Sequence, residues 1–245
     1  MPKLYKIKGF TLLEVVIVLA IVGLLLAGGV NLLSGSADTS KYKQTQNELQ
    51  EIKESLVTYY TQLKRLPCPD TDGDGIENPP VVTGTCTNIR GFLPHVTLGV
   101  GGNGDAWGER IKYVVSPKFV TMVTPPTPPS ICTDNTLRTI NPISDIVVVQ
   151  DLQSTGQTIA EFSAFALLST GKNGRQTNGL MTGAFTNDGG CTGLNVREQE
   201  NCDTDSTLRF GTQMSDGTTI TFDDMVVWVG DYQLISQLRK AGGCN

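Results

Sequence analysis

A long apolar segment near the start of the chain constrains its fold more than any other feature. The residues from Phe10 to Leu33 are mainly apolar, and Lys3, Lys6 and Lys8 precede them. As a helix this segment would be about 36 Å long, against a hydrocarbon core of about 30 Å. Lysines before a span favour the cytoplasmic side. We therefore expect one membrane-spanning helix, with the rest of the chain on the other side.

Glu14 is the only ionisable side chain between Lys8 and Asp38. A carboxylate inside a bilayer costs about 3 kcal/mol or more, so it needs a partner or a proton. The alternative is a charge tolerated near the interface. A secretory signal peptide would have a shorter, uncharged apolar region followed by a small-residue cleavage site. This segment is too long for that pattern and carries Glu14 inside its apolar run, and we predict a functional role for Glu14.

The run Lys8-Gly9-Phe10-Thr11-Leu12-Leu13-Glu14, continued by Val15-Val16-Ile17-Val18, resembles the class III signal of type IV prepilins and type II secretion pseudopilins. The resemblance implies that a prepilin peptidase cuts between Gly9 and Phe10 and methylates the new amino group of Phe10. It also implies that Glu14 faces the positive amino terminus of a neighbouring subunit during assembly. Two opposite charges brought together in a low-dielectric bundle would satisfy each other.

The same resemblance implies the location of the chain and its binding partners. We expect a cytoplasmic leader at 1–9, a transmembrane and filament-core helix at 10–33, an amphipathic continuation at 34–66 and a periplasmic head at 67–245. The chain would first be a single-pass protein of the inner membrane and later part of a pilus or pseudopilus. Its expected partners are the prepilin peptidase, other pilin or pseudopilin subunits, the inner-membrane assembly machinery and the membrane.

The helix is predicted to continue beyond the apolar segment. Weak helix formers between Gly28 and Ser36 suggest a bend or a loosened stretch. After it, apolar residues at three- and four-residue intervals predict one face able to lie along a head. Pro67 and Pro69 end this pattern. The members of the face are Leu49, Ile52, Leu56, Tyr59, Tyr60 and Leu63.

The remainder is rich in glycine, proline, threonine and short β-type runs, which predicts a sheet-containing head with long loops. One long helix followed by mainly antiparallel strands gives an α+β class. A short terminal helix is predicted at Asp231–Lys240, with Leu234, Ile235 and Leu238 on one face. The predicted strands are Arg110–Val115, Ile146–Val149, Phe165–Leu168, Thr218–Phe222 and Met225–Val229.

Two segments of the head resemble parts of the major pseudopilins. The segment Asp105–Tyr113 is similar to their passage from a loop to the first strand, and Leu168–Gly174 is similar to a strand and turn near the end of such heads. We interpret the first as a turn in which Trp107 fills the core under the helix, because buried aromatic residues usually serve packing.

All six cysteines follow the apolar segment. An even number favours disulfides in an oxidising compartment. Zinc would need close Cys or His pairs, which the sequence lacks. The short intervals 68/86 and 191/202 suggest the simplest pairs, while other pairings stay open. The cysteines are Cys68, Cys86, Cys132, Cys191, Cys202 and Cys244.

An acidic stretch beginning at Asp70 is the strongest candidate for a metal site. Asp70, Asp72 and Asp74 alternate with other residues as at the start of an EF-hand loop, which favours calcium. The twelfth position is Val81, so a site would also use Glu77, backbone carbonyls or distant acids. Some pseudopilins use calcium to order a head loop, and the resemblance therefore supports calcium. The alternative is an acidic turn that binds no metal.

Catalysis has no clear support in the sequence. The only histidine, His95, has no nucleophile signalled nearby, which leaves little basis for a triad. The segment Gly99–Gly104 fits G-x-G-x-x-G, but no helical pattern follows, so it is not a dinucleotide site. Without its leader the chain has 16 basic and 24 acidic side chains, a net charge of -8. Nucleic acid is therefore not expected as a general partner.

We predict a structural, non-enzymatic subunit. The head is larger than that of a usual major subunit, so the family resemblance favours a minor pilin. The alternative is a binding module at a pilus tip, in which the loops Thr71–Thr87 and Arg175–Gly217 recognise a surface, DNA or a protein. A third hypothesis is an anchored periplasmic hydrolase, whose activity would not depend on Glu14.

Overall fold

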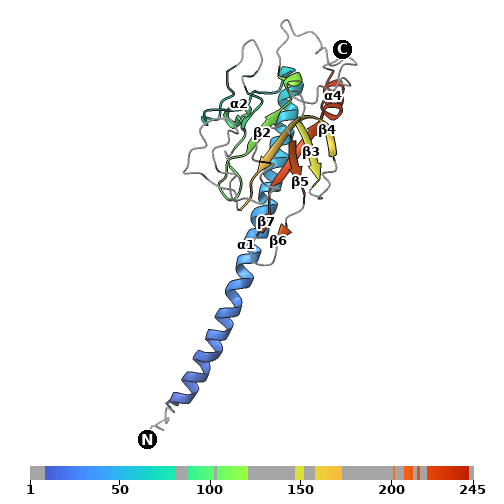
Figure 1. Ribbon diagram of the computed structural model, residues 1–245. Coiled ribbons are helices and arrows are strands. Elements are labelled where there is room, and N and C mark those ends of the chain that lie inside the picture. Colours follow the sequence, from blue (N-terminus) through green and yellow to red (C-terminus); the bar gives the residue numbers. More distant parts are fainter. Residues whose placement is uncertain are drawn as a thin grey trace. The chain divides into compact units, whose positions relative to one another are not determined.

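The computed structural model describes the chain in several stretches (Figure 1). They are residues 9–80, 86, 88–101, 104–120, 147–151, 158–172, 201, 207–211, 214–215 and 220–242. Within them, the side chains of 25–37, 147–151, 161, 207, 214–215 and 220–221 are not described. The chain divides into two compact units, Met1–Lys43 and Gln44–Asn245, and each is described by itself.

Helix α1, Leu12–Leu63, has residues in both units. In the first unit its large apolar side chains are exposed, with Leu12 at 84% and Leu24 at 77%. Among the described residues, no helix combines the length and the hydropathy needed to cross a membrane. The predicted span from Phe10 to Leu33 includes residues 25–33, whose side chains lie outside the description. The span therefore stays a prediction.

The weak helix formers between Gly28 and Ser36 do not interrupt α1, which is helical throughout this stretch. Each costs at most about 1 kcal/mol relative to alanine. Helix formation is cooperative, and only its nucleation is strongly unfavourable. A long helix that is already formed can therefore continue through a few such residues.

The second unit begins at Gln44, so the rest of α1 packs with the head. Most of the predicted apolar face is buried there, namely Leu49, Ile52, Leu56 and Tyr60. Two members differ from the prediction, because Tyr59 is half-buried and Leu63 is 46% exposed. Leu63 is the last helical residue, and at Lys64 the backbone turns into the left-handed region with φ 61°.

The head contains a six-stranded sheet in the order β1-β2-β4-β3-β5, with β8 also paired to β4. Strands β2 and β8 both pair with residues 165–168 of β4 and so lie on its opposite edges. All pairs are antiparallel except β3 with β5. The strands are β1 (Arg90–Phe92), β2 (Lys112–Val115), β3 (Val147–Asp151), β4 (Thr158–Ser169), β5 (Thr207–Phe210) and β8 (Met225–Gly230).

The smaller elements complete the head. Strands β6 (Met214–Ser215) and β7 (Ile220–Phe222) form a two-stranded sheet. A short helix, α2 (His95–Leu98), follows β1, and a 3-10 turn, η1 (Pro117–Phe119), follows β2. Figure 1 shows the main sheet beside the part of α1 that belongs to the head. These elements confirm the predicted α+β class, with a long helix and a mainly antiparallel sheet.

Each predicted strand coincides with an observed one, although the bounds differ. The largest difference is in β4, which was predicted as Phe165–Leu168 and extends over Thr158–Ser169. Its first half alternates small, polar and apolar residues, and its pairing with β3 supplies the hydrogen bonds. The sequence analysis did not predict β1, β5, β6 or α2. These elements are two to four residues long, too short to show a period.

The core of the sheet joins residues far apart in the sequence. Val114 of β2, Ala166 and Leu168 of β4, Leu208 of β5 and Val226 of β8 form one buried apolar cluster. Side chains on one face of neighbouring strands meet because successive residues point to opposite faces. This cluster fixes the register of the sheet, since a one-residue slip would turn it toward solvent.

The terminal helix α4, Asp231–Lys240, has the predicted bounds. It buries Leu234, Ile235 and Leu238, as predicted from their spacing. The carboxyl group of Asp231 lies in the first turn, where an anion is favoured by the helix dipole.

Candidate functional site

A short non-helical segment precedes α1. Gly9, Phe10 and Thr11 are exposed and lie outside the helix, and a Cβ atom added to Gly9 would meet nothing within 4 Å. Exposed, irregular backbone near a terminus is where peptidases cut most readily. The predicted cleavage position between Gly9 and Phe10 thus lies in accessible backbone.

Thr11 caps the start of α1. The backbone N–H of Glu14 donates to Thr11 Oγ1 at 3.3 Å and to the Thr11 carbonyl at 3.1 Å. Threonine at this position satisfies one of the unpaired donors of the first turn. The sequence analysis did not assign this role to Thr11, although Thr-x-x-Glu is the spacing of a capping box. Because the cap follows the cleavage position, trimming after Gly9 would leave the helix start intact.

The first turns of α1 present apolar side chains in every direction. Phe10, Leu12 and Leu13 are 69% to 84% exposed, and the large apolar residues from Val15 to Leu24 are at least 43% exposed. A helix that is apolar all round is normally buried among other helices or in lipid. Glu14 lies in the first turn, where a negative charge is favourable. We therefore expect this surface to be covered by neighbours of low polarity. Glu14 is the charged group within it.

The acidic loop, residues 70–77, brings Asp70, Asp72 and Asp74 together. One carboxylate oxygen from each lies within 4.8 Å of those of the other two. The loop also satisfies its own backbone. Asp70 accepts from the N–H of Gly73 at 2.6 Å and of Gly75 at 2.8 Å. Calcium binding by these three residues stays a prediction.

The charge of Asp72 is favoured by its surroundings. The backbone N–H of Asp74 is the main cause of a pKa below the ordinary aspartate value, and hydrogen bonds from the side chains around it, including Asn78, act in the same direction. Asn78 donates from Nδ2 to Asp72 Oδ2 at 3.2 Å. Asp72 and Asp74 are both exposed, whereas Asp70 is buried. The loop therefore presents two carboxylates to solvent.

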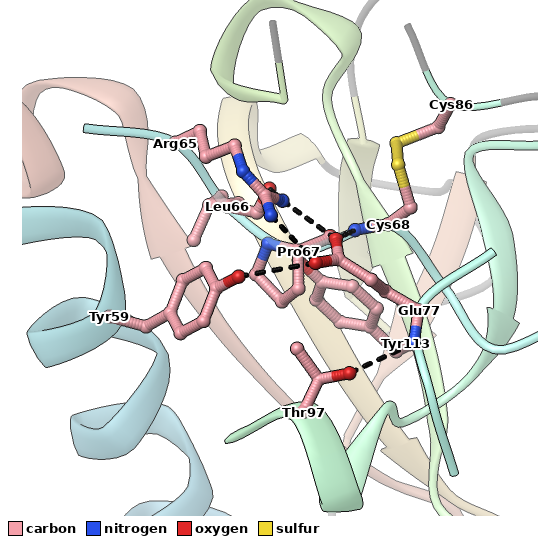
Figure 2. Close-up of a disulfide and its surroundings, with 9 residues drawn as sticks. All are labelled: Tyr59, Arg65, Leu66, Pro67, Cys68, Glu77, Cys86, Thr97 and Tyr113. Carbon is pink, nitrogen blue, oxygen red and sulfur yellow. Dashed lines mark hydrogen bonds and ion pairs between the residues drawn. A yellow bond between two sulfur atoms is a disulfide. The ribbon is translucent and has the colours of Figure 1, made fainter. Parts of the chain in front are cut away.

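Glu77, which was predicted as a further calcium ligand, is engaged elsewhere. Figure 2 shows its carboxylate facing Arg65, whose Nη1 and Nη2 each donate at 2.6 Å. The N–H of Cys68 donates to the same carboxylate at 3.0 Å. The structure does not place Glu77 in the metal-capable group formed by the three aspartates. A buried carboxylate is more stable beside a buried guanidinium than alone. Glu77 therefore pairs with Arg65, although it lies close in sequence to the three aspartates.

Two tyrosines enclose the Arg65–Glu77 pair. Tyr59 donates from its hydroxyl to Glu77 at 3.3 Å, and Tyr113 donates to the Pro67 carbonyl at 3.2 Å. Burial raises the pKa of Tyr59 to about 12, and Glu77 acts in the same direction. The pair and its tyrosines therefore join the end of α1 to the first loop and to β2.

A disulfide closes the loop beside this pair. Cys68 and Cys86 are bonded, with their Cα atoms 5.4 Å apart (Figure 2). This is one of the two pairs that their short spacing suggested. The other cysteines, Cys132, Cys191, Cys202 and Cys244, lie outside the described residues.

The two head segments that resemble pseudopilins are in contact. Asp105 accepts from the N–H of Trp107 at 2.9 Å and of Glu109 at 2.9 Å, which forms the predicted turn. Its other oxygen accepts from the Ser169 hydroxyl at 2.5 Å. Ser169 in turn accepts from the N–H of Gly171 at 3.2 Å. The hydrogen bond between Asp105 and Ser169 gives both polar side chains a structural role at the junction of the two segments.

Two sequence interpretations are refined by the structure. Trp107 is half-buried and is not among the fully buried core residues, although its indole Nε1 is inaccessible to solvent. Its ring is therefore packed inside only in part, and it is not the fully buried core residue that was predicted. His95 packs against the acidic loop so closely that a Cβ atom on Gly75 would clash with its Cε1. Val96 donates its N–H to the Gly75 carbonyl at 2.9 Å, so this histidine belongs to a packed turn.

Residues 4–30 match the family model described as the prokaryotic N-terminal methylation motif. This motif is the prepilin-type signal of type IV pilins and pseudopilins. It covers the predicted cleavage position, Thr11, Glu14 and the exposed apolar turns of α1, and it does not extend to the head. No curated protein and no solved structure matches the chain. The match supports a structural, pilin-like subunit that is processed by a peptidase and assembles with other subunits.

Proposed function

We propose that the chain bearing this prepilin-type signal is a minor structural subunit of a type IV pilus or a type II secretion pseudopilus. The observation that carries the proposal is the methylation motif at residues 4–30, which includes the turns of α1 whose apolar side chains are exposed. Large exposed apolar surfaces mark sites of association. In the proposed filament, the first part of α1 is covered by the corresponding helices of neighbouring subunits.

Processing follows from the order of groups along the chain. The peptidase cuts after Gly9, which releases the leader with its lysines and gives Phe10 a new amino group. Thr11 lies beyond the cut and keeps its cap on the first turn. Glu14 then follows the new terminus closely and offers a carboxylate to the methylated amine of a neighbour. In a bundle of apolar helices either charge alone would be costly, whereas the pair is mutually compensated.

The remaining part of the proposal concerns location. Before assembly, the segment from Phe10 to Leu33 lies in the inner membrane and the head lies in the periplasm. The disulfide between Cys68 and Cys86 supports this side of the membrane, because such bonds form and persist in oxidising compartments. After assembly, the head lies on the outside of the filament.

The first test is mass spectrometry of the N-terminal peptide from membranes of the native host, with and without the processing peptidase. We expect a chain that begins at methylated Phe10 in the first case and retains Met1 in the second. An intact Met1 in both cases, or cleavage after the apolar segment, would contradict the proposal. It would favour an anchored or secreted binding protein instead.

A second test uses Glu14→Ala, with Glu54→Ala as a matched control on the exposed face of the same helix. Filament incorporation is expected to fail for the first variant and to persist for the second. An anchored hydrolase predicts no such difference between the two variants, since an activity of the head would survive the loss of Glu14. The copy number of the chain per sheared filament then separates a minor from a major subunit.

A further inference from the structure

Two aspartate–glycine pairs, Asp72–Gly73 and Asp74–Gly75, follow each other in the loop after α1. An aspartate before a glycine is a site at which a protein chain can isomerise without any enzyme. The nitrogen of the glycine attacks the side-chain carboxyl carbon of the aspartate, and a five-membered succinimide ring forms as one water molecule leaves. Glycine favours this step because it has no Cβ that would shield the nitrogen.

The ring then takes up one water molecule and opens at either of its two carbonyl carbons. Opening at one carbon restores aspartate. Opening at the other gives isoaspartate, in which the main chain runs through the former side-chain carboxyl and the former main-chain carbonyl becomes a free carboxylate. One water leaves and one returns, so the mass is unchanged, but the main chain is longer by one methylene carbon.

A longer main chain would disturb this loop, because its backbone is fixed at both ends of the two pairs. Asp70 and Phe92 exchange backbone hydrogen bonds of 3.0 Å and 2.8 Å. The carbonyl of Gly75 accepts from the N–H of Val96 at 2.9 Å. An extra main-chain carbon between these anchors would force one of them to move.

The fold requires the glycine of each pair. Gly73 and Gly75 have φ 87° and 84°, a region that is unfavourable for residues with a Cβ. A Cβ would also meet the guanidinium of Arg110 at the first position and the ring of His95 at the second. Asp72 and Asp74 are exposed to water. The loop therefore contains two sites of isomerisation that replacing glycine cannot remove.

Asp70 is buried and holds the attacking nitrogen of both pairs. Its Oδ1 accepts from the N–H of Gly73 at 2.6 Å, and its Oδ2 accepts from the N–H of Gly75 at 2.8 Å. The attack requires each nitrogen to lose this proton. A negative charge beside a group makes the loss of its proton less favourable, and a hydrogen bond to a charged acceptor is stronger than one to a neutral acceptor.

The two carboxylates under attack are held as well. Asp72 Oδ1 accepts from the N–H of Asp74 at 3.4 Å, and Asp74 Oδ1 accepts from the N–H of Ile76 at 2.7 Å. Each carboxylate thus bonds the nitrogen two residues ahead, whereas the reaction needs its carbon to meet the nitrogen of the next residue. Both reacting groups of each pair are therefore restrained.

We propose that Asp72 and Asp74 are isomerisation sites, and that Asp70 suppresses the reaction at both by holding the nitrogen of the glycine that follows each. Asp70 is in this respect a positioning residue, with one oxygen for each nitrogen. The protection depends neither on a filament nor on a bound metal.

The first test compares isomerisation in the folded and the unfolded chain. The full chain is aged at neutral pH with a chelator, in detergent alone and in detergent with concentrated urea, and the disulfide stays intact. Trypsin then releases residues 66–90, which contain both pairs, and electron-transfer fragmentation identifies isoaspartate at each position. We expect both pairs to react about tenfold more slowly, or slower still, in the folded chain, the factor expected for a hydrogen bond to a charged group.

The second test uses Asp70→Asn, which keeps the size of the side chain but removes its charge and one acceptor oxygen. Isomerisation in the folded variant is expected to rise about tenfold at one or both pairs. Asp105→Asn is the matched control, because Asp105 is also buried and accepts from two backbone N–H groups of another turn. It should leave both rates at the wild-type value, and circular dichroism checks that both variants fold.

Three results would overturn the proposal. They are equal rates in the folded and unfolded wild type, unchanged rates in a folded Asp70→Asn variant, and an equal rise with Asp105→Asn. Should Asp70→Asn fail to fold, hydrogen exchange of the wild type decides. The N–H groups of Gly73 and Gly75 should then exchange about tenfold or more slowly than in the unfolded chain, and exchange at the unfolded rate would show that Asp70 does not hold them.

Discussion

The guanidinium of Arg65 meets the carboxylate of Glu77 through two hydrogen bonds of 2.6 Å, and both side chains are buried. Arg65 follows the end of α1, and Glu77 closes the acidic loop. The N–H of Cys68 adds a third donor to the carboxylate. The pair thus fixes the loop to the helix independently of the disulfide. Burial acts to lower the pKa of Arg65, but its bonds to Glu77 outweigh this and raise the pKa above its ordinary value.

Glu77→Ala is expected to destabilise the head by about 3 to 5 kcal/mol, because it leaves a buried guanidinium without its partner. The measurement is urea unfolding of the full chain in detergent, followed by circular dichroism. Arg65→Met combined with Glu77→Leu should recover part of the loss, since removing both charges avoids the unpaired one. Recovery should be incomplete, because the Cys68 N–H loses its acceptor. A loss below about 1 kcal/mol for Glu77→Ala, the size expected of an exposed pair, would contradict this assignment.

Lys64 directly follows α1 and lies in the left-handed region, with φ 61°. This conformation costs a residue with a Cβ about 1 to 2 kcal/mol. Its ammonium offsets part of this by donating to the Thr61 carbonyl at 2.8 Å. Lys64→Gly and Lys64→Ala both lose that hydrogen bond, but only glycine also relieves the strain. We expect the glycine variant to be the more stable by about 1 kcal/mol, measured by thermal unfolding. An alanine variant at least as stable as the glycine variant would show that Lys64 is not strained.

The regular elements of the fold could be predicted from local patterns. The face at Leu49, Ile52 and Leu56 and the helix α4 show a period near 3.6 residues, which does not depend on distant contacts. The pairing of β3 with β5 could not be predicted in this way. Its partners are separated by about 60 residues, and strand pairing is decided by packing against neighbours.

The candidate sites, too, could be predicted only where their residues lie close together in the sequence. Asp70, Asp72 and Asp74 were identified because their spacing alone brings carboxylates together in a short loop. The partner of Glu77 was not, since Arg65 lies on the other side of two prolines and reaches it only when the loop folds back on α1. The hydrogen bond between Asp105 and Ser169 joins residues 64 positions apart in the sequence. Such contacts depend on the assembled head, and no local motif encodes them.

Calcium is expected to stabilise the head if it binds Asp70, Asp72 and Asp74 as their spacing predicts. A ligand at ten to a hundred times its Kd adds about 1.4 to 2.7 kcal/mol to the free energy of unfolding. The measurement is the Tm of the full chain in a chelator and then in millimolar calcium, with magnesium as the control cation. Asp72→Asn combined with Asp74→Asn should remove the response. An unchanged Tm in calcium would contradict the prediction and leave a hydrogen-bonded acidic turn.

Asp231 is expected to make the head less stable as pH rises from about 4 to 6. Burial raises its pKa to about 6, and Lys118 of η1 only partly opposes this. Tyr60 of α1 also interacts with it, and the Asp231 charge raises the pKa of Tyr60 beyond the effect of burial. Since the unfolded carboxyl ionises near pH 4, the unfolded state loses its proton first. The native state is therefore favoured most below pH 4 and loses stability until the pH passes about 6.

The size of this effect follows from the shift of about two pKa units, which corresponds to about 3 kcal/mol. Other carboxylates titrate in the same range, and Asp72, with its lowered pKa, acts in the opposite direction. The measurement is therefore the difference in unfolding free energy between the wild type and Asp231→Asn at several pH values. The unfolding free energy of the variant should rise relative to that of the wild type between pH 4 and 6. Above pH 6 the difference between the two should stay constant. A difference that does not change with pH would mean that the carboxyl of Asp231 titrates alike in the folded and unfolded chains, and that its burial at the start of α4 imposes no charge penalty.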